Sequence, residues 1–378
     1  MKKCQVYIAA SSPSVLTVST VHSAAVPRLL GSISDVTDTT PPSSLKILIL
    51  SYMRSGSTLC GDILQAHPDV FYVYEPLLYL WDYYVPHKHL QGASVRQRTK
   101  HFWRQSKPYL PEPLDFLDYM FGCNMTTYNV EFLTNVWHSW DFSAVDCFNR
   151  WEHGNVLVNL TQDCVDRLHQ RCLNKTIVQK VVRLSMAEAD VYLQRDPDVR
   201  IIHLIRDPRG ILLSRMRFNQ KTSGEMHKNY TNICRRMWED IRVSREIAEK
   251  HWGRILTIRY EDLAQHPFSL TTILYRFVGL DVLPGVKSYV RSITSSERFR
   301  SNGKVMAKKT ARKYPFKTAY RWRHELPFPL AREVDQTCRK VLNAMGYISY
   351  PTEQQLRNVN IPAKLNSYGK GLMTAQMV

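Results

Sequence analysis

The chain lacks the short motifs that accompany zinc or nucleoside-triphosphate chemistry. None of its 8 cysteines lies in a CxxC pair or at a Cys/His ligand spacing, so no metal site is predicted. It also lacks GxxxxGK[ST], because its one comparable loop has a single glycine, Gly56, and Arg54 stands before that glycine. Binding of a β,γ-phosphate pair with magnesium is therefore not expected.

Residues 1–44 lack an apolar run of about 20 residues, the length that a membrane-spanning helix needs. The apolar stretch 4–10 is shorter than a convincing signal core, and residues 11–44 are rich in Ser, Thr and Pro. We therefore expect 1–44 to be a flexible stem or an imperfect signal or anchor region. The sequence does not decide whether an anchor is missing from this version of the chain or is cryptic.

Acidic residues are scarce relative to basic ones, and the formal net charge is +18. Such a surface attracts polyanions, of which nucleic acid is the commonest. However, the chain has no RNP sequence, zinc-finger spacing or helix-turn-helix signature, and its basic residues are spread over its length. No nucleic-acid partner is predicted, and an acidic polysaccharide or a multiply phosphorylated small molecule accounts for the charge equally well. The densest basic stretch, 298–323, fits either ligand or a solvated loop.

The segment 46–59 is the most informative part of the chain. The apolar run 47–50 has no polar alternation, which is typical of a strand buried on both faces of a parallel sheet. Small residues follow at 55–58, and a helix is predicted over 58–66. Backbone N–H groups and the positive end of a helix dipole would meet an anion in this loop. The segment therefore predicts an anion-binding turn.

A second segment of the same type lies at 199–217. It has a buried strand over 201–205, then Arg206, then a helix that we expect to begin at Pro208, the favoured first position. Ser214 lies two helical turns further on, on the side that can face Arg206. Two anion-binding loops at the carboxyl ends of parallel strands suit a ligand with two separated phosphate-like groups.

Further apolar stretches complete the predicted fold. Strands are expected at 70–74, 176–182 and 254–260, and helices at 186–195, 230–249 and 270–278. Strands that alternate with helices imply right-handed crossovers and a parallel sheet. The fold class is therefore α/β, with a parallel sheet flanked by helices.

The two anion-binding segments resemble those of sulfotransferases that use 3′-phosphoadenosine 5′-phosphosulfate. Residues 52–59 are similar to the 5′-phosphosulfate loop of that family, and 205–214 to its 3′-phosphate motif. Together with 65–76, the first loop is most similar to the Golgi carbohydrate 6-O-sulfotransferases that act on galactose and N-acetylglucosamine. The resemblance covers 45–350 and includes Arg321-Trp322-Arg323, Cys338 and Gly346-Tyr347; it implies a P-loop-like sulfotransferase fold for 45–350, with 351–378 as a tail.

The resemblance also implies roles for individual residues. The 3′-phosphate would be held by Arg206 and Ser214. Glu75 would be the catalytic base, since a sugar hydroxyl needs a carboxylate to take its proton. Arg54 would also be catalytic, because a fixed cation stabilises charge on the leaving oxygen. The 5′-phosphosulfate would be held by Arg54 and by the backbone amides of Ser55, Gly56, Ser57, Thr58 and Leu59. The cytosolic branch of the family uses a histidine base and a loop lysine, and neither has support at matching positions here.

The segment 77–175 matches the family least and predicts a helical, cysteine-bearing insertion that shapes the acceptor side. Sequons occur at Asn124, Asn159, Asn174 and Asn229, which favours a glycosylated protein of the secretory pathway and, with the resemblance, the Golgi lumen or membrane. The segment also holds cysteines that we interpret as disulfide-bonded, with the pairing left open; they are Cys123, Cys147, Cys164 and Cys172.

Two other functions stay open at this point. Asp196-Pro197-Asp198 is a formal DxD motif, which a metal-dependent lumenal glycosyltransferase would use, but it precedes a strand instead of following one. A non-catalytic protein that binds polyanionic glycans would need the charge but not both phosphate loops. The sugar hydroxyl that is sulfated and the oligomeric state are not encoded in any pattern that we can interpret.

Overall fold

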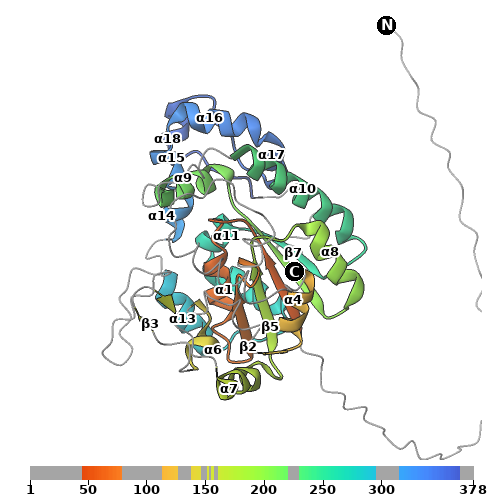
Figure 1. Cartoon of the computed structure of the whole chain (residues 1–378). Coiled ribbons are helices and arrows are strands. Elements are labelled where there is room, and N and C mark those ends of the chain that lie inside the picture. The colour runs from red at the N-terminus through yellow and green to blue at the C-terminus, as the bar shows by residue number, and fades with distance from the viewer. Residues whose placement is uncertain are drawn as a thin grey trace, which may run out of the picture. The chain divides into compact units, whose positions relative to one another are not determined.

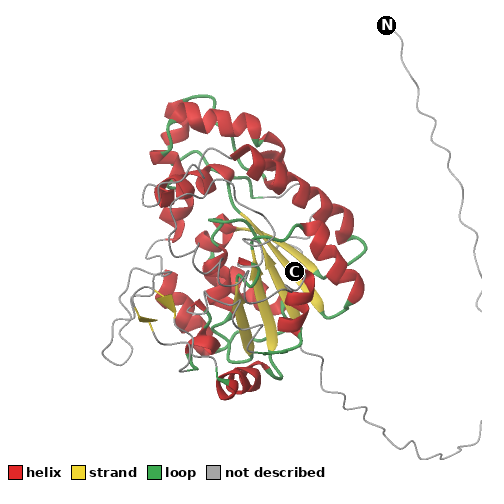
Figure 2. Ribbon diagram, in the orientation of Figure 1, coloured by secondary structure: helices red, strands yellow, loops and turns green. Residues whose placement is uncertain are grey.

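The protein contains a parallel five-stranded sheet in the order β2-β5-β1-β6-β7 (Figures 1 and 2). The computed structural model describes residues 45–78, 113–126, 138–145, 151–152, 155–156, 161–219, 230–294 and 315–366. The strands of the sheet are β1 (Lys46–Leu50), β2 (Val70–Tyr74), β5 (Thr176–Val181), β6 (Val199–Ile205) and β7 (Ile255–Arg259). Each lies where the sequence predicts a strand, which confirms the α/β class with a parallel sheet.

Helices cover both faces of the sheet because its strands are apolar on both. Leu48 and Leu50 of β1 face one core, whereas Ile47 and Ile49 face the other. The first core is closed by α4 (Pro113–Phe121), α7 (Gln162–Cys172) and α8 (Met186–Arg195). The second is closed by α1 (Ser57–Leu64), α11 (Tyr260–Gln265), α12 (Pro267–Phe277), α13 (Pro284–Thr294) and α14 (Pro315–Tyr320).

A third hydrophobic cluster joins the helices that follow β6 to those near the end of the chain. Figure 1 shows several of them grouped together on one side of the sheet. They are α9 (Pro208–Asn219), α10 (Tyr230–Ala248), α15 (Trp322–Glu325), α16 (Phe328–Thr337), α17 (Arg339–Met345) and α18 (Glu353–Arg357). The disulfide Cys234–Cys338 links α10 to the end of α16, and the sequence analysis did not predict it.

The described parts of the 77–175 segment are mainly helical, as predicted. They also include α6 (Trp140–Ser143) and a small antiparallel sheet of β3 (Trp151–Glu152) and β4 (Asn155–Val156). A disulfide between Cys123 and Cys172 links the end of α4 to the end of α7, and Cys164 is disulfide-bonded as well, which confirms the expectation for these three cysteines. Cys147 and the stem 1–44 lie outside the described residues.

No helix among the described residues is long and apolar enough to cross a membrane. Asn124 and Asn174, which begin two of the sequons, are described, while Asn159 and Asn229 lie outside the described ranges. Much of the basic stretch 298–323 is likewise outside them, so its predicted ligand contacts stay predictions.

Candidate active site

The loop between β1 and α1 is held in a conformation that requires a glycine. Gly56 has φ 90°, in the left-handed region, and a Cβ there would lie 2.2 Å from Cδ2 of Tyr260. Ser55 is buried, and its Oγ accepts a hydrogen bond from the backbone N–H of Tyr52. Gly56 is the residue before α1 begins at Ser57, so the first amides of the helix open directly from this loop. The predicted anion-binding turn thus has the required backbone shape.

Arg54 connects this loop to the second predicted segment. Its φ is 76°, a strained value for a non-glycine residue, and such strain is typical of functional sites. The Arg54 Nε donates to Ser214 Oγ at 3.1 Å, and the guanidinium carbon lies 5.3 Å from the ring centroid of Phe218. Both contacts come from α9. Ser214 therefore does face the site, although it meets Arg54 and not Arg206.

Arg206 reaches the same loop from the carboxyl end of β6. One terminal nitrogen, Nη1, donates to the Arg54 carbonyl at 2.9 Å, and Nη2 donates to the Thr318 carbonyl at 3.0 Å. The guanidinium carbon lies 4.6 Å from the ring centroid of Tyr260. Arg54 and Arg206 are far apart in the sequence, but the structure brings them together at this loop.

One hydrogen-bond donor of the Arg206 guanidinium is not used by the contacts above. Its Nε is buried, and no hydrogen-bond partner for it exists among the described residues. Gly210 leaves space beside this nitrogen on the α9 side, since a Cβ at Gly210 would lie 3.1 Å from it. A buried donor without a partner costs free energy, so the arrangement fits a phosphate oxygen that would accept from Arg206.

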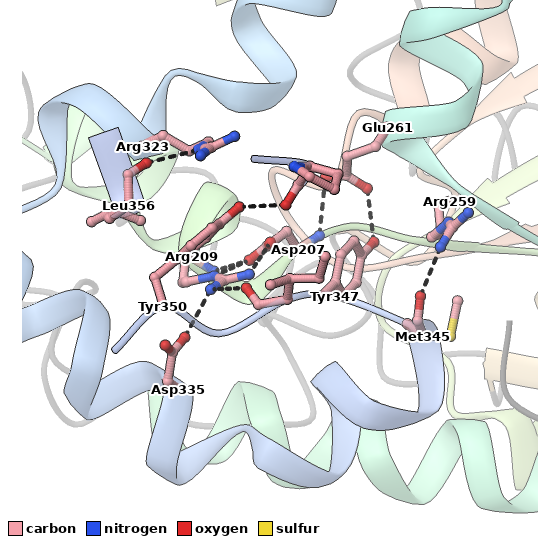
Figure 3. A network of polar contacts seen from close by, with 12 residues as sticks. Asp207, Arg209, Arg259, Glu261, Arg323, Asp335, Met345, Tyr347, Tyr350 and Leu356 are labelled. Atoms are coloured by element: carbon pink, nitrogen blue, oxygen red, sulfur yellow. Dashed lines mark hydrogen bonds and ion pairs between the residues drawn. The ribbon is translucent and has the colours of Figure 1, made fainter. Parts of the chain in front are cut away.

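The segment that carries Arg206 is fixed by a buried network of charges (Figure 3). Arg209 Nη2 donates to Asp207 Oδ2 at 2.7 Å, and its Nη1 donates to Asp335 Oδ1 at 2.9 Å. Glu261 accepts hydrogen bonds from the Asp207 backbone N–H and from the Tyr347 hydroxyl. Burial and the charge of Asp207 raise the pKa of Glu261 to about 7, although Arg206 and Tyr347 oppose that shift.

Glu75 follows β2 directly and forms ion pairs with two cations. Its backbone N–H donates to the Lys180 carbonyl on β5, and its φ of 45° is again in the left-handed region. The carboxylate oxygens Oε1 and Oε2 lie 2.6 Å from Lys180 Nζ and 2.7 Å from Arg183 Nη1, respectively. Burial raises the pKa of Glu75, but the two cations outweigh it and hold the pKa below its usual range. Glu75 is therefore ionised at neutral pH.

Tyr74 links Glu75 to the donor-side loop. Burial and the Glu75 charge raise its pKa; a hydrogen bond to Thr58 lowers it, and a hydrogen bond to Glu75 raises it further. The Tyr74 ring also lies 3.7 Å from Lys180 Nζ and stacks on His138 at 4.0 Å. The predicted base and the predicted donor loop thus belong to one connected set of side chains.

Sequence reasoning missed three cations of the site. Arg215 of α9 donates to the Met53 carbonyl, and burial, together with the charges of Arg236 and Arg54, lowers its pKa to about 10. The other two, Lys180 and Arg183, bind Glu75. A signal for Lys180 was present in the sequence, because a lysine interrupts the otherwise strand-like stretch at 176–182.

Two other polar groups in or beside the sheet lie in structural surroundings. His203 on β6 is buried, and burial with the charge of Arg236 lowers its pKa to about 3, so it is neutral at physiological pH. Asp196 of the formal DxD motif pairs with Lys46 at 2.6 Å. Lys46 begins β1, so this pair lies at the amino ends of the strands, away from the loops described above.

Comparison with known proteins gives a consistent picture. A family model described as a sulfotransferase domain matches residues 44–346. Carbohydrate sulfotransferase 6 of Homo sapiens is 25% identical over 378 aligned positions, which cover 87% of this chain and 88% of that protein. Carbohydrate sulfotransferase 4 of Mus musculus is 24% identical, with 85% of this chain and 87% of that protein covered. Carbohydrate sulfotransferase 1 of Homo sapiens is 27% identical, with 83% and 82% covered.

Solved structures with some likeness to the chain include two that are under 20% identical to it. The sulfotransferase domain from the curacin biosynthetic pathway is 18% identical with a TM-score of 0.42, and the match covers 79% of this chain and 97% of that one. Retinol dehydratase in a complex with retinol and PAP is 16% identical with a TM-score of 0.42, with 81% and 83% covered.

Proposed function

The chain belongs to the sulfotransferase family, and from that premise we propose that it transfers a sulfuryl group to a carbohydrate. The donor is 3′-phosphoadenosine 5′-phosphosulfate, and the acceptor is a sugar hydroxyl of a glycan or proteoglycan. The 6-hydroxyl of galactose or N-acetylglucosamine is the proposed position. Relatives named carbohydrate sulfotransferases, each covered over more than four fifths of its length, support the acceptor class.

The observation that carries the proposal is the meeting of Arg54 and Arg206 at one loop. Arg206, whose buried Nε has no partner among the described residues, would hold the 3′-phosphate together with Ser214. The amides of 55–59 and the Arg54 guanidinium would hold the 5′-phosphosulfate. Guanidinium contacts to phosphate oxygens are strong and directional, so two arginines from different segments would together fix the position of the donor.

The chemistry assigned to the chain's own residues needs no metal. Glu75 would take the proton of the acceptor hydroxyl, and it is ionised at neutral pH because two cations neighbour it. Arg54 cannot serve as a proton donor, so its contribution would be electrostatic stabilisation of the leaving oxygen. Such an interaction strengthens as charge develops and therefore lowers the barrier.

The same premise supports a place in the secretory pathway. The disulfides Cys123–Cys172 and Cys234–Cys338 suit an oxidising compartment. We propose the Golgi lumen or membrane as the location, with membrane association through an N-terminal anchor of the kind expected in the family. A glycan chain is the proposed partner, and it complements the net charge of +18.

The test is transfer of labelled sulfate to a panel of desulfated glycans by wild type, Arg54→Ala and Glu75→Gln. We expect Glu75→Gln to lose turnover by about 10²- to 10⁴-fold, the usual contribution of a general base. It should keep its affinity for 3′-phosphoadenosine 5′-phosphate, measured as thermal stabilisation without metal. Full activity of Glu75→Gln would remove that residue from the base role.

The panel also separates the alternatives. A metal-dependent glycosyltransferase would be stabilised by a nucleotide sugar with manganese and not by the bisphosphate. A non-catalytic glycan-binding protein would bind the panel without transferring label. Either result in the wild-type protein would overturn the proposed function.

A further inference from the structure

Lys180 is a buried lysine whose charge is directed at one carboxylate oxygen. The residue is 1% exposed, and its Nζ lies 2.6 Å from Glu75 Oε1 and 3.7 Å from the centroid of the Tyr74 ring. Arg183 holds the other oxygen, Oε2, at 2.7 Å, but its side chain is 18% exposed. The two cations therefore differ in exposure: the Arg183 side of the carboxylate is partly open to solvent, whereas Lys180 is buried on the other side.

A charged lysine in the middle of a sheet needs a reason. Lys180 lies on β5, between β2 and β1, where every residue of the strand is buried. Burial disfavours an ammonium group strongly, and a hydrophobic residue of similar size is often at least as stable at such a position. The fold alone therefore gives little reason for this lysine, whereas a requirement on Glu75 would explain it.

Other charged or titratable groups face this carboxylate from the elements around it. Tyr72 and Tyr74 on β2 interact with Glu75, and Asp62 on α1 interacts with Lys180. His138 stacks on Tyr74 from the 77–175 segment. Burial lowers the pKa of Lys180 itself, and Glu75 opposes that shift. Lys180 and Arg183 are thus the two cations that form ion pairs with the Glu75 carboxylate.

We propose that Lys180 is a positioning residue that keeps Glu75 ionised and fixes Oε1, so that Oε2 faces the acceptor. This inference rests on the proposed function, in which Glu75 is the base. In the step, the acceptor oxygen forms a bond to sulfur and its proton passes to Oε2. The bond from sulfur to the bridging oxygen breaks, and that oxygen leaves with the electron pair on the bisphosphate. Lys180 keeps its proton throughout.

The test compares the pH dependence of kcat in wild type and in Lys180→Met. Loss of an opposite charge at this distance raises the pKa of a carboxyl by about 1–3. We therefore expect the acidic limb of the kcat profile to move to higher pH by about that amount, with KM for the donor unchanged. Lys180→Gln, which also lacks the charge but keeps a hydrogen-bond donor, should show the same displacement if Lys180→Met does not fold.

Lys175→Met is the matched control. Lys175 also pairs with a carboxylate, Asp141 at 3.1 Å, but it precedes β5 at the opposite end of that strand. Its substitution should leave the pH profile at the wild-type position. A purely structural role for Lys180 would lower stability in Lys180→Met and Lys180→Gln without displacing the limb, and that result would overturn the inference.

The double variant Glu75→Gln/Lys180→Met separates the inference from the function on which it rests. If Lys180 acts through Glu75, the second substitution should lower kcat no further in the Glu75→Gln background. Full activity of Glu75→Gln alone would reject the base assignment. An inactive Glu75→Gln together with an undisplaced limb in Lys180→Met and Lys180→Gln would reject only the role of Lys180.

Discussion

Arg206 and Arg209 lie on either side of the start of α9, yet they belong to two different regions of the molecule. Arg209 is fully buried and forms salt bridges to Asp207 and Asp335, with its guanidinium carbon 3.9 Å from the Trp322 ring centroid. Arg206 instead donates to two carbonyls, and among the described residues it forms no salt bridge. One arginine has its charge compensated by direct ion pairs inside the protein, while the other does not.

The difference distinguishes charges that ion pairs neutralise within the protein from charges that hydrogen-bond only to carbonyl oxygens among the described residues. A carbonyl oxygen satisfies a donor but carries no full negative charge, so Arg206 is left without a direct counter-ion in the part of the chain that the structure describes. Arg215 repeats this pattern, since it donates only to the Met53 carbonyl within the described chain. An anion bound at the loop would complete both groups. The contrast therefore gives a physical criterion for the proposed donor site that does not depend on relatives.

The strongest way to break this comparison is to remove each arginine in turn. Arg209→Met leaves Asp207 and Asp335 as buried carboxylates without their cation, which should lower the free energy of unfolding by about 3–5 kcal/mol. Arg206→Met removes two hydrogen bonds to carbonyls but no ion pair, so we expect a smaller loss of stability, together with about 10- to 100-fold weaker binding of 3′-phosphoadenosine 5′-phosphate. Chemical denaturation and calorimetric titration measure the two quantities.

The reverse outcome would contradict the distinction. If Arg206→Met unfolded the protein and Arg209→Met kept its stability while losing the bisphosphate, the compensated arginine would be the ligand-binding one. Arg217→Met is a suitable control, because Arg217 is on the same helix and pairs with Glu325 at a half-exposed position. Surface pairs of this kind contribute about 0–1 kcal/mol.

The sheet and the loops that carry Arg54 and Arg206 were largely predictable from the sequence, whereas the buried network around Arg209 was not. Buried strands and small-residue loops are local patterns, so the strands of the sheet, Arg54 and Arg206 could be located from them. The salt bridge of Arg209 to Asp335 and the disulfide Cys234–Cys338 join segments more than 100 residues apart, and no local pattern encodes such pairings. The role of Lys180 was not predicted for a related reason. Its partner, Glu75, is distant in the sequence and comes close only because β2 pairs with β5.

Ionisation of Glu261, which accepts a hydrogen bond from the Asp207 backbone, should give a second and smaller effect on stability. Burial and the charge of Asp207 raise the pKa of Glu261 to about 7, so ionisation of this carboxyl is unfavourable in the folded state. The stability that its neutral form contributes is complete below the usual pKa of 4.5 and is lost as pH rises from there through about 7. We expect Glu261→Gln to remove up to about 3 kcal/mol of this pH dependence.

The measurement is the free energy of unfolding of wild type and Glu261→Gln between pH 4.5 and 8. Tyr347→Phe sharpens it, because the Tyr347 hydroxyl donates to Glu261 and lowers its pKa. In Tyr347→Phe the loss of stability should therefore continue to higher pH than in wild type. Parallel curves for wild type and Glu261→Gln would show that Glu261 does not titrate in this range.

The smallest expected effect on stability concerns a salt bridge that is only half-buried, the pair Lys46–Asp196. Lys46 and Asp196 lie 2.6 Å apart with side chains 29% and 25% exposed, at the amino ends of the strands. Asp196→Asn should cost about 0–1 kcal/mol of unfolding free energy, because solvent screens such a pair. It should also leave sulfate transfer unchanged, since the donor loop follows the carboxyl end of β1, at the other end of the sheet.

Because Asp196 belongs to the formal DxD motif, the same variant also tests the rival function. Manganese-dependent glycosyl transfer from a nucleotide sugar by wild type, lost in Asp196→Asn, would favour the metal-dependent alternative. An ion pair would then not be enough to identify a charge as structural. The charged side chain would also have to be buried, as Arg209 is.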